Sequence, residues 1–222
     1  QDPSARALLL WEALQPVPMA AETRNGTDPR IRRAVTVGKI LEHLAPNLAT
    51  VHPVEPTGPE ECSRLQMNTF VSAYAVMEHH VPSYQEWLLR QPIEVLVQAY
   101  EDYRQQLQVL QWQRPDAGHW VLKSPAHLYT LDALLRVFPD ASVVQLHRDP
   151  RKVIPSLCSL FAVYQGITSD HVRCQQLGAQ ALELCLQGYH RSMRARQTAR
   201  PGQILDLQYR DLTAHPWEAI ER

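Results

Sequence analysis

The pattern of apolar and polar residues predicts alternating strands and helices in the middle of the chain. Residues 120–122 form a short apolar run that ends at Lys123, and residues 142–146 form a second run. Between them, apolar side chains recur at helical spacing, at Leu128, Leu131, Leu134, Leu135 and Phe138. A helix that joins two parallel strands makes a right-handed crossover. We therefore predict a strand–helix–strand–helix unit over residues 120–156.

Proline residues mark where these elements begin and end. Pro125 follows the first apolar run and suits the first turn of a helix, where its missing N–H group would have no partner. The pair Pro139-Asp140 interrupts the helical repeat. Asp149 is a suitable N-cap residue and Pro150 follows it, so a further helix is predicted to begin there.

The rest of the chain is predicted to be mainly helical, with proline-containing turns. Helical periodicity covers residues 29–44, 65–77, 82–89, 93–112 and 167–194. The last region is interpreted as one long helix or as two helices divided near Gly178. Residues 204–208 form a third apolar run and are predicted as a strand. No strand is predicted ahead of the helix at residues 7–14. Three prolines and one glycine make residues 52–62 an irregular loop.

Cationic side chains follow the two strands of the central unit. Lys123 comes directly after the first strand, and Arg148 lies just beyond the second. In open parallel sheets, ligands bind beyond the carboxyl ends of the strands, where the N-termini of helices also favour negative charge. Ser156, in the following helix, adds a hydroxyl group. We predict that these side chains together form a phosphate or sulfate site. For each residue considered alone, the simpler interpretation is that Arg148 pairs with Asp149 and that Lys123 lies in solvent.

Three motifs of this unit carry a resemblance to a known family. They are Lys-Ser-Pro-Ala-His at 123–127, Leu-Leu-Arg-Val-Phe-Pro-Asp-Ala at 134–141 and His-Arg-Asp-Pro-Arg-Lys-Val-Ile-Pro-Ser at 147–156. The chain resembles sulfotransferases that use 3′-phosphoadenosine 5′-phosphosulfate (PAPS), nearest the bacterial group similar to tyrosylprotein sulfotransferases. The resemblance extends over nearly the whole chain. It implies a P-loop-like, three-layer α/β fold with a central parallel sheet flanked by many helices.

The resemblance also implies roles for individual residues. Arg148 and Ser156 match the residues that hold the 3′-phosphate of the nucleotide, and Lys123 matches the lysine that contacts the transferring sulfuryl group. Tyr209, in Tyr-Arg-Asp-Leu after the third predicted strand, matches a tyrosine that contacts the nucleotide. Glu12 matches the general base that takes the proton from the acceptor. A carboxylate with a raised pKa suits that task, because an alcohol is a poor nucleophile until it loses its proton.

Other interpretations of these residues stay open. Glu12 is equally compatible with the surface of an amphipathic helix, and Tyr209 with the core. His52, Glu60 and Glu61, in the irregular loop, are secondary acid–base candidates. The simpler role of Glu60 and Glu61 is that of carboxylates at the start of the next helix, where the helix dipole favours them. His127 follows Lys123, but not at the spacing of the catalytic histidine of cytosolic sulfotransferases, so we interpret it as a residue on a helix face.

The chain departs from the family pattern at its start. The loop rich in Gly, Ser and Thr that cradles the 5′-phosphosulfate in the family has no match here. We therefore expect one sulfotransferase-like domain over residues 1–222, truncated at both ends. The family's basic C-terminal loop has no counterpart before Arg222 either.

Composition and charge argue against several classes of function. The formal net charge of −1 over 222 residues argues against nucleic-acid binding. The basic residues Arg30, Arg32 and Arg33 are interpreted as a solvated helix face. The four cysteines show no paired spacing, and there is neither a signal peptide nor a run long enough to span a membrane, so a cytoplasmic protein with reduced thiols is expected. No histidine or carboxylate spacing indicates a metal site.

We therefore hypothesise an enzyme that transfers a sulfuryl group from PAPS to a hydroxyl or amine, without a metal. The partner would be a small-molecule or peptidyl hydroxyl acceptor, and an oligomer is compatible with the sequence. One alternative is a P-loop phosphotransferase, but the motif G-x-x-x-x-G-K-[S/T] is absent. The other is a degenerate or truncated relative that only binds nucleotide or a partner.

Overall fold

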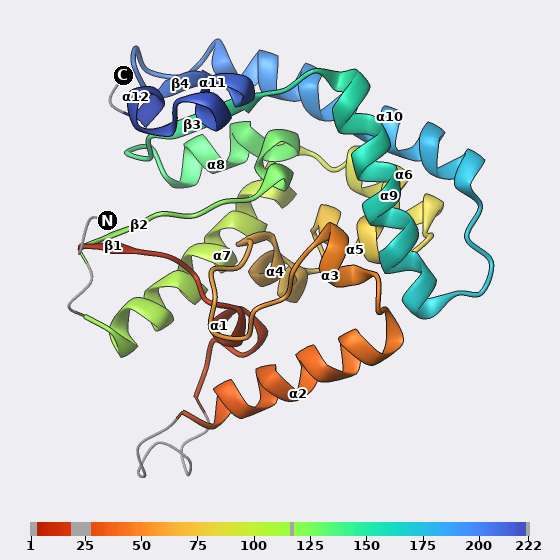
Figure 1. Cartoon of the computed structure of the whole chain (residues 1–222). Helices are drawn as coiled ribbons and strands as arrows, with labels where there is room; N and C mark the ends of the chain where they lie inside the picture. Colours follow the sequence, from red (N-terminus) through yellow and green to blue (C-terminus); the bar gives the residue numbers. More distant parts are fainter. Residues whose placement is uncertain (1–3, 19–27, 116–117, 221–222) are drawn as a thin grey trace.

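The computed structural model describes residues 4–18, 28–115 and 118–220. It has the predicted α/β arrangement, in which short parallel strands are accompanied by many helices (Figure 1). In chain order, the elements are β1 Ala5–Arg6, α1 Leu10–Leu14, α2 Pro29–Leu44, α3 Leu48–Val51, α4 Ser63–Gln66, η1 Met67–Thr69, α5 Ala73–Glu78, α6 Pro82–Leu89, α7 Ile93–Gln113, β2 His119–Trp120, η2 Pro125–Thr130, α8 Leu131–Val137, β3 Val143–His147, α9 Pro150–Thr168, α10 Cys174–Arg196, β4 Ile204–Gln208, α11 Tyr209–Ala214 and α12 Pro216–Ile220.

The described strands form two parallel pairs. β1 pairs with β2, which places Arg6 opposite Trp120, and β3 pairs with β4, which places His147 opposite Gln208. One prediction was therefore wrong, because a strand does precede α1. Within the described ranges, β2 and β3 do not pair with each other. A two-residue strand such as β1 carries no periodicity. Its hydrogen bonds depend on a partner more than a hundred residues away.

The helix predicted over residues 65–77 is interrupted. The chain forms α4 and η1, and Phe70 then adopts a left-handed backbone conformation with φ of 57°. The hydroxyl of Ser72 accepts the N–H of Tyr74 at 3.2 Å and begins α5 as an N-cap. Local side-chain bonds of this kind compete with a continuous helix.

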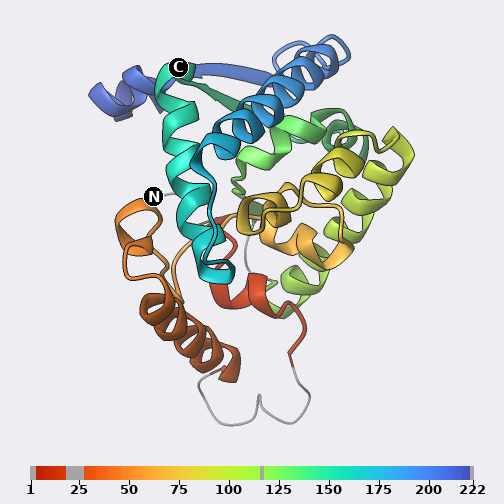
Figure 2. The same ribbon diagram turned by 90° about the vertical axis from the view of Figure 1, so that its right-hand side faces the viewer.

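In the later helical region, α10 is one long helix that is not divided near Gly178. α9 ends at Thr168, and the hydroxyl of Ser169 accepts the N–H of His171 in the turn that follows. α10 runs without interruption through Gly178. The two helices lie side by side in both views (Figures 1 and 2).

The main core lies along one face of α7. The buried residues of that face recur at helical spacing, at Leu96, Tyr100, Tyr103, Leu107 and Leu110. They pack against Leu8, Leu65 and Val137, so α7 supports both the N-terminal segment and α8. A second cluster joins α9 and α10 to α5 and α6. None of the helices within the described ranges combines the length and hydropathy needed to cross a bilayer.

Arg30 is part of this interior, contrary to its interpretation as a solvated residue. Its guanidinium pairs with Asp28, the N-cap of α2, at 2.7 Å and binds the side-chain oxygen of Gln113 at 2.8 Å. It also lies 4.6 Å from the ring of Trp11. Arg32 and Arg33 are exposed as predicted.

Two glycines of α10 provide a test of how this helix packs against η2. A Cβ atom at Gly188 would lie 2.1 Å from the ring of Tyr129, whereas one at Gly178 would meet nothing within 4 Å. We expect Gly188→Ala to lower the free energy of unfolding by about 1–3 kcal/mol through overpacking. Gly178→Ala, the matched control, should raise it by up to about 1 kcal/mol. Urea unfolding measures both, and equal stabilisation by the two variants would contradict this packing of Tyr129.

Candidate functional site

Lys123, the predicted sulfuryl-contacting residue, lies just after β2 and faces a carboxylate. Its side chain is 72% exposed, and its Nζ atom contacts Oε1 of Glu61. The side chain of Glu61 is 18% exposed and comes from the segment ahead of α4. The lysine is therefore neither alone nor simply in solvent, because a partly buried acid lies against it.

Backbone hydrogen bonds on both sides of Glu61 hold that acid in place. The N–H of Glu60 donates to the carbonyl of Leu8 at 2.8 Å, and the N–H of Cys62 donates to the carbonyl of Lys123 at 3.2 Å. The loop is thus tied at one point to the N-terminal segment and at the other to the residue after β2. Glu61 reaches Lys123 because these two bonds fix the intervening backbone.

Arg148 and Tyr209 are brought together by the register of β3 and β4. The last residues of the two strands, His147 and Gln208, are register partners, so the residues that follow them lie next to each other. The guanidinium carbon of Arg148 lies 4.7 Å from the centre of the Tyr209 ring. Both side chains are exposed at the carboxyl ends of the strands, the position at which parallel sheets bind ligands.

Asp149 does not neutralise Arg148. It caps α9 by accepting the N–H of Arg151 at 2.9 Å, and its carboxylate pairs with the guanidinium of Arg151, which holds the pKa of Asp149 below its ordinary value. Within the described ranges, Arg148 has no acidic partner. Ser156 is exposed in the second turn of α9, and its hydroxyl forms no hydrogen bond to another described residue.

Asp206, the acidic residue of the neighbouring strand β4, also pairs with residues other than Arg148. Asp206 of β4 is bound by Arg196 and lies 2.6 Å from Nε2 of His147, and these two contacts lower the pKa of its carboxyl group. Arg196 comes from the last turn of α10. The carboxylate therefore does not compete with an anionic ligand for Arg148.

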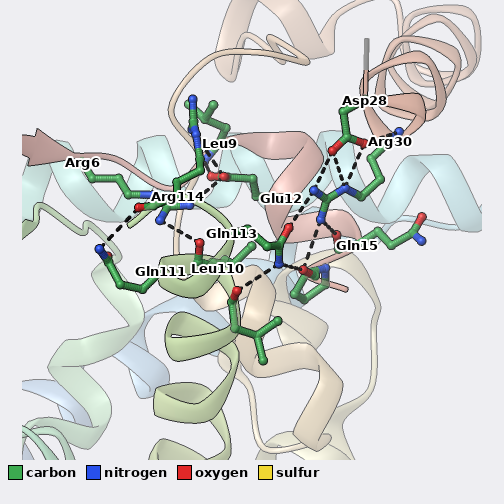
Figure 3. Close-up of polar contacts among 12 residues, drawn as sticks. Arg6, Leu9, Glu12, Gln15, Asp28, Arg30, Leu110, Gln111, Gln113 and Arg114 are labelled. Atoms are coloured by element: carbon green, nitrogen blue, oxygen red, sulfur yellow. Dashed lines mark hydrogen bonds and ion pairs between the residues drawn. The ribbon is translucent and has the colours of Figure 1, made fainter. Parts of the chain in front are cut away.

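Glu12, the predicted base, lies in an enclosed ion pair (Figure 3). It is 1% exposed, and its Oε1 atom accepts a hydrogen bond of 2.8 Å from Arg6, which is itself 5% exposed. Oε2 accepts the N–H of Leu9 at 3.1 Å, and Arg114, the residue after α7, approaches Oε1 at 3.5 Å. This carboxylate joins β1 and α1 to the end of α7, whereas the carboxylate that contacts Lys123 is Glu61.

His127 is enclosed rather than lying on an open helix face. Its Nε2 atom lies 2.9 Å from Sγ of Cys62 and its Nδ1 atom 2.7 Å from the hydroxyl of Tyr100, which lies 2.9 Å from the hydroxyl of Thr130. Burial lowers the pKa of His127 to about 4 and raises that of Cys62 to about 11. The two side chains have no further metal-ligating companion: in the part of the chain that the structure describes, no three His, Cys, Asp or Glu residues are grouped to hold a metal.

Comparison with known proteins identifies the family. A sequence model of the sulfotransferase family matches residues 2–222. The chain belongs to the sulfotransferase family. The crystal structure of the sulfotransferase STF1 from Mycobacterium tuberculosis H37Rv is 32% identical and superimposes over 99% of this chain with a TM-score of 0.82. The sulfotransferase STF9 from Mycobacterium avium is 28% identical over 100% of this chain, also with a TM-score of 0.82.

The match to a curated protein is shorter. The omega-hydroxy-beta-dihydromenaquinone-9 sulfotransferase Stf3 of Mycobacterium bovis is 28% identical over 103 residues, which is 46% of this chain and 26% of that protein. The chain also spans only 59% of STF1 and 56% of STF9. The resemblance inferred from the motifs is thus confirmed at the level of the family and of its α/β fold.

Sequence reasoning located the sulfotransferase-like strand ends but missed the partners of several residues. Arg6 gave no sequence signal, and Cys62 was considered only as one of four free thiols. Glu61 was named as a secondary candidate because it follows a proline-rich loop. Its contact with Lys123 joins residues 62 positions apart, which no local pattern indicates.

The enclosed imidazole of His127 predicts an acid-sensitive fold. The unfolded chain takes up a proton on this residue below about pH 6.5, whereas the folded chain resists protonation until about pH 4. Its contribution to stability is therefore present above pH 6.5 and is lost as the pH falls from 6.5 to 4. We expect it to lower the free energy of unfolding by about 2 kcal/mol between pH 7 and pH 4.5.

Urea unfolding at the two pH values measures this loss. His127→Gln should reduce the pH dependence, and the exposed His171→Gln should leave it unchanged. If wild type and His127→Gln showed the same pH dependence, His127 would not be its cause.

Proposed function

We propose that this protein transfers a sulfuryl group from PAPS to an acceptor hydroxyl. The observation that carries the proposal is the placement of Arg148 in a chain of the sulfotransferase family. This cation is exposed at the ends of parallel strands and stacked with Tyr209, and none of the acids among the described residues pairs with it. A hydroxyl acceptor agrees with the name of one relative, the omega-hydroxy-beta-dihydromenaquinone-9 sulfotransferase.

The residues around Arg148 suit a phosphorylated nucleotide. A guanidinium group donates two parallel hydrogen bonds to phosphate, and the exposed hydroxyl of Ser156 adds a donor on the next helix. The ring of Tyr209 offers an apolar face at the same strand ends. We propose that Arg148 and Ser156 hold the 3′-phosphate and that Tyr209 contacts the nucleotide.

Lys123 is proposed to stabilise the charge that develops during transfer. PAPS supplies the sulfuryl group: the acceptor oxygen forms a bond to sulfur while the bond from sulfur to the phosphate oxygen breaks. The ammonium group of Lys123 is exposed and positioned by its contact with Glu61, so it is available to the transferring group and to the leaving oxygen. Such preorganised charges usually make the largest contribution to catalysis of group transfer.

The proton of the acceptor needs a carboxylate within reach. The family resemblance assigns this role to Glu12, whose oxygens are occupied by Arg6 and Leu9 in an enclosed site. Glu61 is the carboxylate that contacts Lys123. We therefore propose that Glu61 takes the proton, with Glu12 as the alternative that the resemblance implies.

Nucleotide binding tests the role of Arg148. Arg148→Ala removes a charge-assisted hydrogen bond of about 2–3 kcal/mol, so we expect the affinity for 3′-phosphoadenosine 5′-phosphate to fall roughly 30- to 150-fold. Affinity for AMP, which lacks the 3′-phosphate, should change little. Calorimetric titration of the full chain measures both. Arg151→Ala is the matched control, because that nearby arginine is paired with Asp149. Unchanged affinity in Arg148→Ala would remove Arg148 from the site.

Two substitutions separate the candidate bases. Glu61→Gln should keep the fold and lower turnover by about 100-fold or more, the usual loss for a general base. Glu12→Gln leaves the buried guanidinium of Arg6 without its carboxylate and should lower the free energy of unfolding by about 3–5 kcal/mol. Urea unfolding measures the stability of each variant. Turnover is measured as the release of 3′-phosphoadenosine 5′-phosphate from PAPS in the presence of a panel of alcohols and phenols.

Glu42→Gln, on the exposed face of α2, is the control for removing a carboxylate. An active Glu61→Gln variant together with a stable, inactive Glu12→Gln variant would return the role of base to Glu12.

A further inference from the structure

A cavity of about 770 Å³ lies between α8, the end of α10 and the turn ahead of β4. Four arginines from these three segments line it: Arg136 from α8, Arg191 and Arg194 from α10, and Arg200 from the turn. The acid in its lining is Asp132. The concentration of cations is local, because the formal net charge of the whole chain is −1.

Most of this positive charge is not neutralised by the residues that the structure describes. Asp132 is engaged by Arg191, whose Nε atom lies 3.2 and 3.1 Å from the two carboxylate oxygens. The other three guanidinium groups form no hydrogen bond or ion pair with another residue of the described ranges. Gathering like charges around one cavity costs free energy unless an anion offsets it.

The dipoles of α8 and α10 explain only part of this clustering of arginines. Arg136 and Arg194 lie in the last turns of their helices, where a cation is favoured by the helix dipole. Arg200 lies in no helix. Gln203, which is 8% exposed, holds this turn: its side chain donates to the carbonyls of Pro139 and Ala141 at 2.9 and 3.1 Å and accepts the N–H of Arg200 at 3.0 Å. A buried amide thus fixes the backbone that presents Arg200 to the cavity.

The cavity lies at the opposite end of the strands from the proposed nucleotide site. Pro139 and Gln203 precede β3 and β4, whereas Arg148 and Tyr209 follow them. The length of β3 alone separates the two ends by roughly 13 Å. None of the residues that line the cavity belongs to the site assigned to sulfuryl transfer.

We propose that this cavity is a second anion site, which binds a small molecule with at least two phosphate groups. A guanidinium group donates two parallel hydrogen bonds to phosphate oxygens, and the three unpaired guanidinium groups around one hollow exceed what a single phosphate needs. The arrangement favours a small ligand over a polymer, because the arginines gather around one open hollow instead of forming the extended basic stripe typical of nucleic-acid binding.

Calorimetry with inorganic pyrophosphate at 0.15 M salt tests the proposal. The protein carries Arg148→Gln throughout, so that the proposed nucleotide site does not contribute. Arg136→Gln with Arg200→Gln removes two cations from the cavity, and we expect at least a tenfold loss of pyrophosphate affinity with unchanged unfolding. Arg32→Gln with Arg173→Gln is the matched control, because these two exposed arginines are also unpaired among the described residues and lie elsewhere.

Inorganic phosphate serves as a second probe and should bind at least tenfold more weakly than pyrophosphate. Three results would overturn the proposal: no pyrophosphate binding in the Arg148→Gln protein, equal affinity in the two double variants, or equal affinity for phosphate and pyrophosphate. Both double variants replace exposed arginines that support no other described side chain, so loss of folding is not expected to obscure the result.

Discussion

The buried ion pair between Arg6 and Glu12 is the contact on which the arrangement of the candidate site depends. Arg6 pairs with Glu12, donates to the carbonyl of Leu110 at 2.9 Å and stacks 4.1 Å from the ring of Trp120. One guanidinium therefore joins β1 to α1, α7 and β2. Because a buried charge is costly without its partner, Arg6 can occupy this position only while Glu12 is beside it.

The position of Lys123 follows from this anchor. β1 pairs with β2, and the segment after β1 accepts the N–H of Glu60 through the carbonyl of Leu8. The same loop returns to the carbonyl of Lys123 through the N–H of Cys62. Glu61 is held between these two bonds, so the contact between its carboxylate and Lys123 depends on the N-terminal segment being fixed to α7.

Two groups of arginines in the described ranges differ in their hydrogen bonding. Arg6 and Arg30 are buried, and several acceptors satisfy each of them, so they contribute to the fold. Arg148 and the three unpaired arginines around the cavity are exposed, and their guanidinium groups have no acceptor among the described residues. Guanidinium groups of the second kind have unused donors and can bind anions from solution. The distinction rests on hydrogen-bond satisfaction and not on residue type.

The sequence by itself determined the features that depend on neighbouring residues. The strand ends that carry Lys123 and Arg148, the N-cap Asp149 and the strand at residues 204–208 follow from apolar runs and from local preferences of proline and aspartate. Only the tertiary structure decided that Asp149 pairs with Arg151 instead of Arg148, that Glu61 contacts Lys123, and that Glu12 is enclosed by Arg6. Most of these outcomes depend on contacts between segments that are distant in sequence, and burial changes the role of a charged residue without changing the local pattern around it.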